Sequence, residues 1–444
     1  MKTFSLLIAG CDVLVRDGER YVVRPDHDIA VRGNRIAAIL PTGQIEPTAS
    51  EACIHAEGML AIPGLINTHT HAAMVLFRGL AEDVPIESWF NDYIWPLESN
   101  EEPDDIYWGT LLAIAEMIQS GVTTFADHYF FCDAIAQAVA ESGVRAHIGW
   151  AVFGHEGEAK LKQTAEFAAR WQNGANGRIT TWMAPHSPYL CDELFLRKTV
   201  EHAKALGIGI HIHCSETPDQ VVLSLKRYGV TPPAMLARAG VFEVPTLLAH
   251  GIALTAEDIA LLRDHDVAIA QCPKTYLKLA MGTAPVRAFL EAGLTVGIGT
   301  DGAVSSNTLD VLEQMRLLAL DQKQAAKDST VMPLQTVLDI TFRGSAAALR
   351  AADLGELAVG KLADIVLLRQ DSARLFPVHD PIANLVYSAQ SSDVDTVICD
   401  GQLLMHRGRL LTIDLARVRA EVSTRLERLS RRAAERRIAT YPTS

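Results

Sequence analysis

The chain has 444 residues, of which 49% are hydrophobic and 21% charged, so one large barrel or two domains with a substantial core are expected. Its formal net charge of −13, without a basic stripe in the sequence, argues against a nucleic-acid partner. No apolar run approaches the roughly 20 residues that a membrane-spanning helix requires, so we also expect no membrane partner.

The N-terminus superficially resembles a lipoprotein signal that ends at Cys11. The apolar run before that cysteine is only seven residues long, and it continues as Val13-Leu14-Val15, which suits a strand running through the cysteine. All seven cysteines of the chain are scattered and form no Cys-x-x-Cys pair, which predicts free thiols in a reducing compartment. We therefore expect a cytoplasmic protein.

Residues 1–58 alternate short apolar runs with turns, which predicts a small all-β segment. The strands expected there are Leu6–Val15, Tyr21–Val23, Asp28–Val31 and Arg35–Leu40.

From residue 59 to residue 358, apolar strands of five to eight residues alternate with helical stretches that often end at a glycine. The eight expected strands are Met59–Asn67, Val122–Ala126, Arg145–Val152, Ile179–Pro185, Ile208–His213, Thr246–His250, Val267–Gln271 and Thr295–Thr300. Eight βα repeats predict an α/β fold, a (β/α)₈ TIM-like barrel.

After two further helices, Thr308–Asp321 and Leu334–Arg343, the chain again becomes β-like. We expect residues 359–444 to pair with residues 1–58, so that both termini build one small β-sandwich domain beside the barrel. The strands expected there are Ala363–Leu368, Val394–Asp400 and Gln402–Leu404. The last predicted helix, from Leu415 to about Arg437, is dense in Arg and Glu and suits a solvated face or a subunit contact.

Histidines gather at the ends of the predicted barrel strands. His69 and His71 follow the first strand, and alternate residues of a strand share a face, so both rings point the same way. Further polar strand ends carry His186, His211, His213, His250 and Asp301. A single His-x-His pair could equally close a strand as two polar residues. Because barrel enzymes place their chemistry at these ends, the joint occurrence predicts a transition-metal site.

Five stretches carry a resemblance to a known family: Pro63–His71, Pro185–Tyr189, His211–Thr217, Gly299–Gly302 and the late run Gly355–Leu368. Together they resemble the amidohydrolase superfamily over nearly the whole chain. Within it the chain is most similar to the 5-methylthioadenosine/S-adenosylhomocysteine deaminases, a branch of the ATZ/TRZ-type aminohydrolases. The stretches that carry this closer likeness are Ala72–Met74, Arg78–Asp83 and Trp95–Glu98.

The resemblance implies one divalent metal ion, with zinc expected, held by His69, His71, His213 and Asp301. A two-metal version of this fold needs a bridging lysine at the end of the fourth strand. The stretch Ile179–His186 contains no lysine, which favours a single ion.

The resemblance also implies catalytic roles. Glu216 would shuttle the proton from water to a ring nitrogen of the substrate, although a carboxylate at a helix N-terminus would be an alternative explanation for it. Asp301 would accept a hydrogen bond from the water and help to protonate the leaving ammonia. His250 would orient the water or stabilise the developing alkoxide. Glu216 and Asp301 would both contact the substrate.

Three further residues are implied to bind substrate. His186 would hydrogen-bond the purine ring, Glu98 would bind the ribose hydroxyls, and Trp89 would flank the sugar; an exposed loop carboxylate is the alternative for Glu98. His211 suits an interior histidine one layer below the site, and the sequence assigns no role to His128.

The expected reaction is hydrolytic deamination of an adenine nucleoside, 5′-methylthioadenosine, to the inosine product and ammonia. S-adenosylhomocysteine and adenosine are further candidates. Two departures from the relatives weigh against S-adenosylhomocysteine. The part of the third strand over His147–Gly154 offers Trp150 and no arginine, and Thr275-Tyr276 stands in place of Ser-Asn.

Two alternatives stay open. One is an aminohydrolase of another N-heterocycle, such as an s-triazine, a pterin or an oxidised purine. The other is a catalytically idle structural homologue. Relatives commonly self-associate, so we expect a homo-oligomer.

Overall fold

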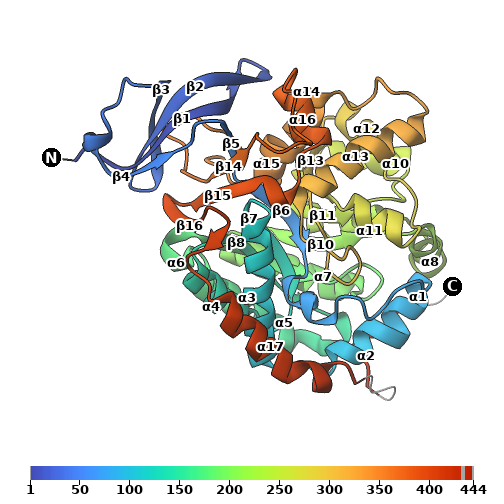
Figure 1. Cartoon of the computed structure of the whole chain (residues 1–444). Helices are drawn as coiled ribbons and strands as arrows, with labels where there is room; N and C mark the ends of the chain where they lie inside the picture. Colours follow the sequence, from blue (N-terminus) through green and yellow to red (C-terminus); the bar gives the residue numbers. More distant parts are fainter. Residues whose placement is uncertain (1, 432–435, 443–444) are drawn as a thin grey trace.

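The structure of the chain is a computed structural model that describes residues 2–431 and 436–442, and two sheets organise it (Figure 1). One sheet has eight strands and forms the barrel, and the other has nine strands and combines segments from both termini. Both predictions of fold, the (β/α)₈ barrel and the shared terminal β domain, are confirmed.

The eight barrel strands are neighbours in chain order, and all adjacent pairs are parallel. Backbone amides of Thr300 and Asp301 both donate to the carbonyl of His69, which brings the end of the last strand against the first. The strands are β6 (Leu65–Thr70), β7 (Val122–Tyr129), β8 (Arg145–Val152), β9 (Ile179–Pro185), β10 (Ile210–Cys214), β11 (Thr246–His250), β12 (Val267–Gln271) and β13 (Thr295–Ile298).

Helices cover the outside of the barrel, because their apolar stripes pack on the strands and their charged faces meet water (Figure 1). They are α3 (Pro103–Gln119), α4 (Cys132–Ser142), α5 (Gly157–Trp171), α6 (Gly174–Gly177), α7 (Glu193–Leu206), α8 (Pro218–Tyr228), α9 (Pro232–Arg238), α10 (Ala256–Arg263), α11 (Pro273–Lys278), α12 (Val286–Glu291), α13 (Val311–Ala326), α14 (Leu334–Asp339), α15 (Ser345–Ala348) and α16 (Pro381–Tyr387).

The terminal sheet has the order β17-β16-β15-β14-β5-β1-β2-β3, with β4 paired to β1. A core separate from the barrel core packs on this sheet. Its strands are β1 (Phe4–Asp17), β2 (Arg20–Arg32), β3 (Arg35–Pro41), β4 (Ser50–His55), β5 (Met59–Pro63), β14 (Ile365–Arg369), β15 (Val394–Cys399), β16 (Gln402–His406) and β17 (Arg409–Leu410).

The prediction of one strand over Met59–Asn67 is wrong. The structure has two strands there, β5 in the terminal sheet and β6 in the barrel, and the chain changes sheet at Gly64. A Cβ on Gly64 would lie 2.2 Å from Oγ1 of Thr123, so only glycine lets the backbone approach β7 this closely. Apolar character runs on through the break, which is why the sequence pattern did not reveal it.

The segment after β6 consists of short helical turns. It contains a 3₁₀ helix, η2 (Ala72–Phe77), followed by α1 (Ile86–Ser88), a π-helical turn, η3 (Trp89–Ile94), and α2 (Trp95–Glu98). This segment forms one wall of the cavity described below.

Helix α17 (Leu415–Leu429) packs along α3, where Arg428 pairs with the buried Asp105 at 2.6 Å. The predicted continuation of this helix toward Arg437 crosses residues 432–435, which lie outside the described residues. Among the helices that the structure describes, none has the length and apolarity to cross a membrane.

Candidate active site

The carboxyl ends of the barrel strands meet at one cavity of about 610 Å³, its open mouth included. Eight of the nine residues predicted for the site line this cavity: Trp89, Glu98, His71, His186, His213, Glu216, His250 and Asp301. The ninth, His69, lies beneath the cavity floor, fully buried. The strand ends and the segment after β6 therefore bring together residues from His71 to Asp301, which are more than 200 positions apart.

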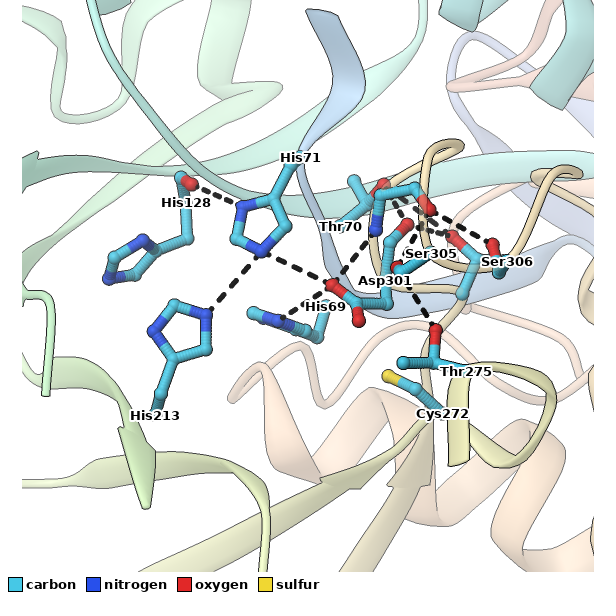
Figure 2. Close-up of polar contacts among 12 residues, drawn as sticks. His69, Thr70, His71, His128, His213, Cys272, Thr275, Asp301, Ser305 and Ser306 are labelled. Carbon is cyan, nitrogen blue, oxygen red and sulfur yellow. Dashed lines mark hydrogen bonds and ion pairs between the residues drawn. The ribbon is translucent and has the colours of Figure 1, made fainter. Parts of the chain in front are cut away.

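Three imidazoles and one carboxylate converge at the floor of the cavity (Figure 2). Oδ1 of Asp301 lies 3.2 Å from Nε2 of His71 and 3.7 Å from Nε2 of His69. The Nε2 atoms of His71 and His213 are 3.4 Å apart. The ring of His250 reaches the same point, since its nitrogen lies within 4.8 Å of donors on His69 and His213.

The far side of each ring is held by a hydrogen bond. Nδ1 of His71 donates to the carbonyl of His128 at 2.6 Å, and Nδ1 of His213 donates to the carbonyl of His186 at 2.8 Å. A carbonyl can only accept, so both Nδ1 atoms carry hydrogen and the two Nε2 atoms are left facing one another at 3.4 Å. A cation that displaced the Nε2 proton of His71 would meet a lone pair from each ring.

His69 completes the donor set from below. Its Nδ1 lies 2.9 Å from Nε2 of His211, while its own Nε2 is buried and has no hydrogen-bond partner within the described chain. The interior histidine expected at position 211 thus also fixes the orientation of His69, as outer partners of metal ligands commonly do.

Electrostatics favour neutral imidazoles at His69 and His213 and an ion pair between His71 and Asp301. Burial and the neighbouring histidines lower the pKa of His69 and of His213 well below the ordinary value. Burial would also lower the pKa of His71, but its hydrogen bond with Asp301 raises it to about 9. The donor chemistry, the unpaired Nε2 of His69 and the facing Nε2 atoms of His71 and His213 fit a divalent transition metal, which would take the place of the His71 proton.

Three residues around this cluster adopt left-handed backbone angles that side chains rarely take. They are Ser215 (φ 51°), His250 (φ 79°) and Asp301 (φ 61°), and each lies within three residues of a strand end. Strain of this kind costs about 1–3 kcal/mol per residue and concentrates at functional sites. Here it turns His250 and Asp301 off their strands toward the cavity.

Glu216 follows β10 and lies against the histidine cluster in a dry environment. Burial, followed by the negative charge of Asp301, raises the pKa of Glu216 to about 7. The hydroxyl of Tyr189 donates to Oε1 of Glu216 at 3.2 Å, and the Glu216 backbone N–H donates to Oε1 of Gln220 at 3.0 Å. A carboxyl group poised near neutrality suits general acid–base chemistry.

Glu98 shares one phenol with a second buried carboxyl group. The Tyr129 hydroxyl lies 2.9 Å from Oε1 of Glu98 and 2.9 Å from Oε1 of Glu101. Burial raises the pKa of Glu98 to about 7, and burial together with the charge of Glu98 raises the pKa of Glu101 well above the ordinary range. Glu98 reaches the cavity and Glu101 stands behind it.

We expect Glu101→Gln to stabilise the protein at high pH. An unfolded Glu ionises near 4.5, whereas folded Glu101 keeps its proton to higher pH, so folding takes up a proton between these two pKa values. Stability is therefore lost as pH rises through the folded pKa, and glutamine abolishes that loss. The difference in Tm between Glu101→Gln and wild type, measured by thermal unfolding, should increase by about 1–4 °C in favour of the variant as pH rises from about 5 to about 9.

The matched control for this prediction is Glu87→Gln, at an exposed position on α1. Its Tm is expected to follow wild type at every pH. If the Tm difference between Glu101→Gln and wild type stays constant or decreases with rising pH, Glu101 is not protonated in the folded protein.

Two aromatic side chains predicted to bind substrate lie in the cavity wall. The ring of His186 stacks on Phe153, with the ring centroids 5.0 Å apart. Trp89 is buried, and its indole N–H has no hydrogen-bond partner within the described chain. Trp150 is turned away from the cavity and packs on Phe167 at 5.5 Å. The third strand instead presents the small side chain of Ala151 to the cavity.

Sequence reasoning missed several residues of the site. Tyr129 and Glu101 are buried beside Glu98, and Glu101 lies in the turn that follows α2, where its backbone N–H donates to the Glu98 carbonyl at 3.1 Å. His128 lines the cavity with both ring nitrogens unpaired in the described structure, and its ring lies 4.6 Å from that of His213. Tyr441 lies close to Glu216 through Gln220, and nothing in the sequence announces it.

An eight-stranded barrel with a histidine and carboxylate cluster at the carboxyl ends of its strands defines a metal-dependent barrel enzyme. The model of the Amidohydrolase family matches residues 60–404. The chain belongs to the amidohydrolase family.

Comparison with known proteins narrows this class. The chain is 44% identical over 431 residues to 5-methylthioadenosine/S-adenosylhomocysteine deaminase of Pelotomaculum thermopropionicum, covering 96% of this chain and 99% of that protein. It is 45% identical over 412 residues to the deaminase of the same name from Desulforudis audaxviator, covering 92% and 95%.

Solved structures agree with this placement. A zinc-bound adenosine deaminase from Xanthomonas campestris has a TM-score of 0.89 at 31% identity and covers 96% of this chain and 98% of its own. A zinc complex of atrazine chlorohydrolase from Arthrobacter aurescens has a TM-score of 0.86 at 26% identity, covering 95% and 100%.

Proposed function

We propose that the protein is a metal-dependent hydrolytic deaminase that converts 5′-methylthioadenosine into the inosine product and ammonia. The observation that carries the proposal is the pairing of two buried carboxyl groups in one cavity, with Glu216 beside the histidine cluster and Glu98 on the wall formed by α2. The names of relatives 44% and 45% identical over most of their length support the same substrate class.

For the metal we propose a single zinc ion, held by His69, His71, His213 and Asp301. The two structural neighbours described above both contain zinc. Bound there, the ion lowers the pKa of water from ~15.7 to roughly 7 and so makes hydroxide available at neutral pH. The fourth barrel strand, β9, offers no lysine that could bridge a second ion.

In the proposed mechanism the chain's own residues place the substrate and move protons. Glu216 accepts the proton of the attacking water and delivers it to a ring nitrogen of the purine. Asp301 accepts a hydrogen bond from the water and later helps to protonate the leaving ammonia. His250 orients the water or stabilises the developing alkoxide on C6, and His186 hydrogen-bonds the ring.

The other end of the cavity suits a sugar with an apolar 5′ substituent. Tyr129 occupies Oε1 of Glu98, while Oε2 has no hydrogen-bond partner among the described residues and is available to the ribose hydroxyls. Trp89 flanks the sugar. The described lining contains apolar side chains such as Met74, Leu279 and Met281 but neither lysine nor arginine. A methylthio group suits this lining better than the charged homocysteine of S-adenosylhomocysteine.

Replacing Glu98 with alanine should raise KM for 5′-methylthioadenosine by about 10- to 100-fold with a smaller effect on kcat. The reason is the loss of charge-assisted hydrogen bonds to the ribose, each contributing about 1.5–3 kcal/mol. Steady-state ammonia release measures both constants. The variant Glu87→Ala, at an exposed position, serves as the control. An unchanged KM for the Glu98 variant would point to a substrate without ribose.

A second candidate is an aminohydrolase of an s-triazine or another N-heterocycle, favoured by the structural likeness to atrazine chlorohydrolase. A panel of adenosine derivatives, triazines, pterins and oxidised purines separates the two. Ammonia release from the nucleosides alone supports our proposal, and release from the ribose-free rings alone refutes it.

All seven cysteines are free, six of them buried, which suits the cytoplasmic location that we propose. Homo-oligomerisation stays a prediction, and light scattering of the purified protein measures it.

A further inference from the structure

The end of the chain lies against two segments that contribute to the cavity. Helix α17 ends at Leu429, and residues 436–442 lie beside α1 and α8 (Figure 1). Within this segment Tyr441 is buried, with 5% of its surface exposed. We call residues 436–442 the terminal strap.

One side of Tyr441 is fixed to the wall that carries the substrate residues. Its backbone N–H donates to Oδ1 of Asn91 at 2.8 Å, and Nδ2 of Asn91 donates to the Tyr441 carbonyl at 3.2 Å. The Tyr441 ring stacks on Phe90 with centroids 5.0 Å apart and planes 8° apart. Phe90 and its neighbour Trp89 line the cavity directly.

The other side of Tyr441 is fixed to the wall that carries Glu216. Nε2 of Gln220 donates to the Tyr441 hydroxyl at 3.2 Å, and the hydroxyl of Thr217 lies 3.4 Å from it. The same Gln220 side chain accepts the backbone N–H of Glu216 at 3.0 Å. The ring of Tyr189, whose hydroxyl donates to Glu216, lies 5.5 Å from the Tyr441 ring.

These contacts make Tyr441 a bridge between two walls that are more than 100 residues apart in sequence. Chain termini are usually poorly ordered unless specific contacts hold them. Tyr441 is held by a pair of backbone hydrogen bonds, a stacked ring and a hydroxyl contact, which is more than a chain end needs. We propose that Tyr441 is a positioning residue, through which the terminal strap orients Glu216 by way of Gln220 and holds the Phe90 wall closed. The inference rests on the proposed role of Glu216.

The test uses Tyr441→Phe and Tyr441→Ala in the full-length, metal-loaded chain. Tyr441→Phe keeps the stacking and loses the hydroxyl, so kcat should fall about threefold with KM unchanged. Tyr441→Ala frees both walls, so kcat should fall about 10- to 100-fold and KM should rise as well. Tyr107→Phe, which loses a hydroxyl contact to Glu141 far from the site, is the matched control and should equal wild type.

Hydrogen exchange gives a readout that does not depend on the substrate. In Tyr441→Ala, exchange should accelerate in residues 86–98 and 216–228 and stay unchanged in the barrel strands. If wild type deaminates none of the nucleosides, the proposed function fails while this measurement still tests the strap. The inference would be overturned if both segments of Tyr441→Ala exchange at the wild-type rate, or if exchange accelerates evenly over the whole chain.

Discussion

Glutamine at position 216 is expected to lower kcat by about 10²- to 10⁴-fold, the usual contribution of a general acid–base residue. Glutamine keeps the shape of the side chain and can still pair with Tyr189, but it cannot accept and release a proton. Because Glu216 is not among the proposed metal ligands, metal content should equal that of wild type. Steady-state kinetics and metal analysis on the same preparation measure the two quantities.

Asp219→Asn is the matched control, since this carboxylate lies three residues further on and is exposed on α8. It should leave kcat within a factor of about two, as surface substitutions usually do. Full activity in Glu216→Gln would refute the proton-shuttle role, and would leave Glu216 as a carboxylate at the N-terminus of α8.

Asparagine at position 301 is expected to lower both metal occupancy and activity, with kcat falling more than about a thousandfold. Asp301 supplies the only negative charge in the proposed donor set, and without the ion the pKa of water returns from roughly 7 to ~15.7. Removing metal from wild type with a chelator should abolish activity, and adding zinc should restore it. The same treatment should fail to restore the variant.

The control for this prediction is Asp328→Asn, an exposed carboxylate that follows α13. Analysis of wild type should find one ion per chain. If Asp301→Asn retains the metal and its activity, the ion is held without Asp301, by one of the two all-histidine groups that meet at this point: His69, His213 and His250, or His71, His128 and His213.

The sequence predicted the architecture because the barrel repeats a simple signal. Most of the apolar strands follow a helix that stops at a glycine, and polar residues stand where several of the strands end. His69, His213 and Asp301 could be assigned to one location on this basis, since parallel strands end on the same side of a barrel. The structure places them within a few ångströms of each other.

Features that depend on contacts between distant segments escaped sequence reasoning. The break at Gly64 depends on how closely the backbone approaches Thr123, which no local pattern encodes. Tyr129 looks like any strand-end aromatic until Glu98 and Glu101 are packed against its hydroxyl. Tyr441 is one aromatic in a polar tail, and its value lies entirely in what the fold places around it.

The pairing of β5 with β14 constrains the order in which the protein can be made. These strands are about 300 residues apart, and among the described residues β5 pairs with β1 on one edge and with β14 on the other. During synthesis the backbone groups on the edge of β5 that pairs with β14 therefore stay unpaired until almost the whole barrel has left the ribosome. His69 and His71 follow β5 almost directly, so the first two histidines of the cluster to be synthesised gain their final anchorage among the last.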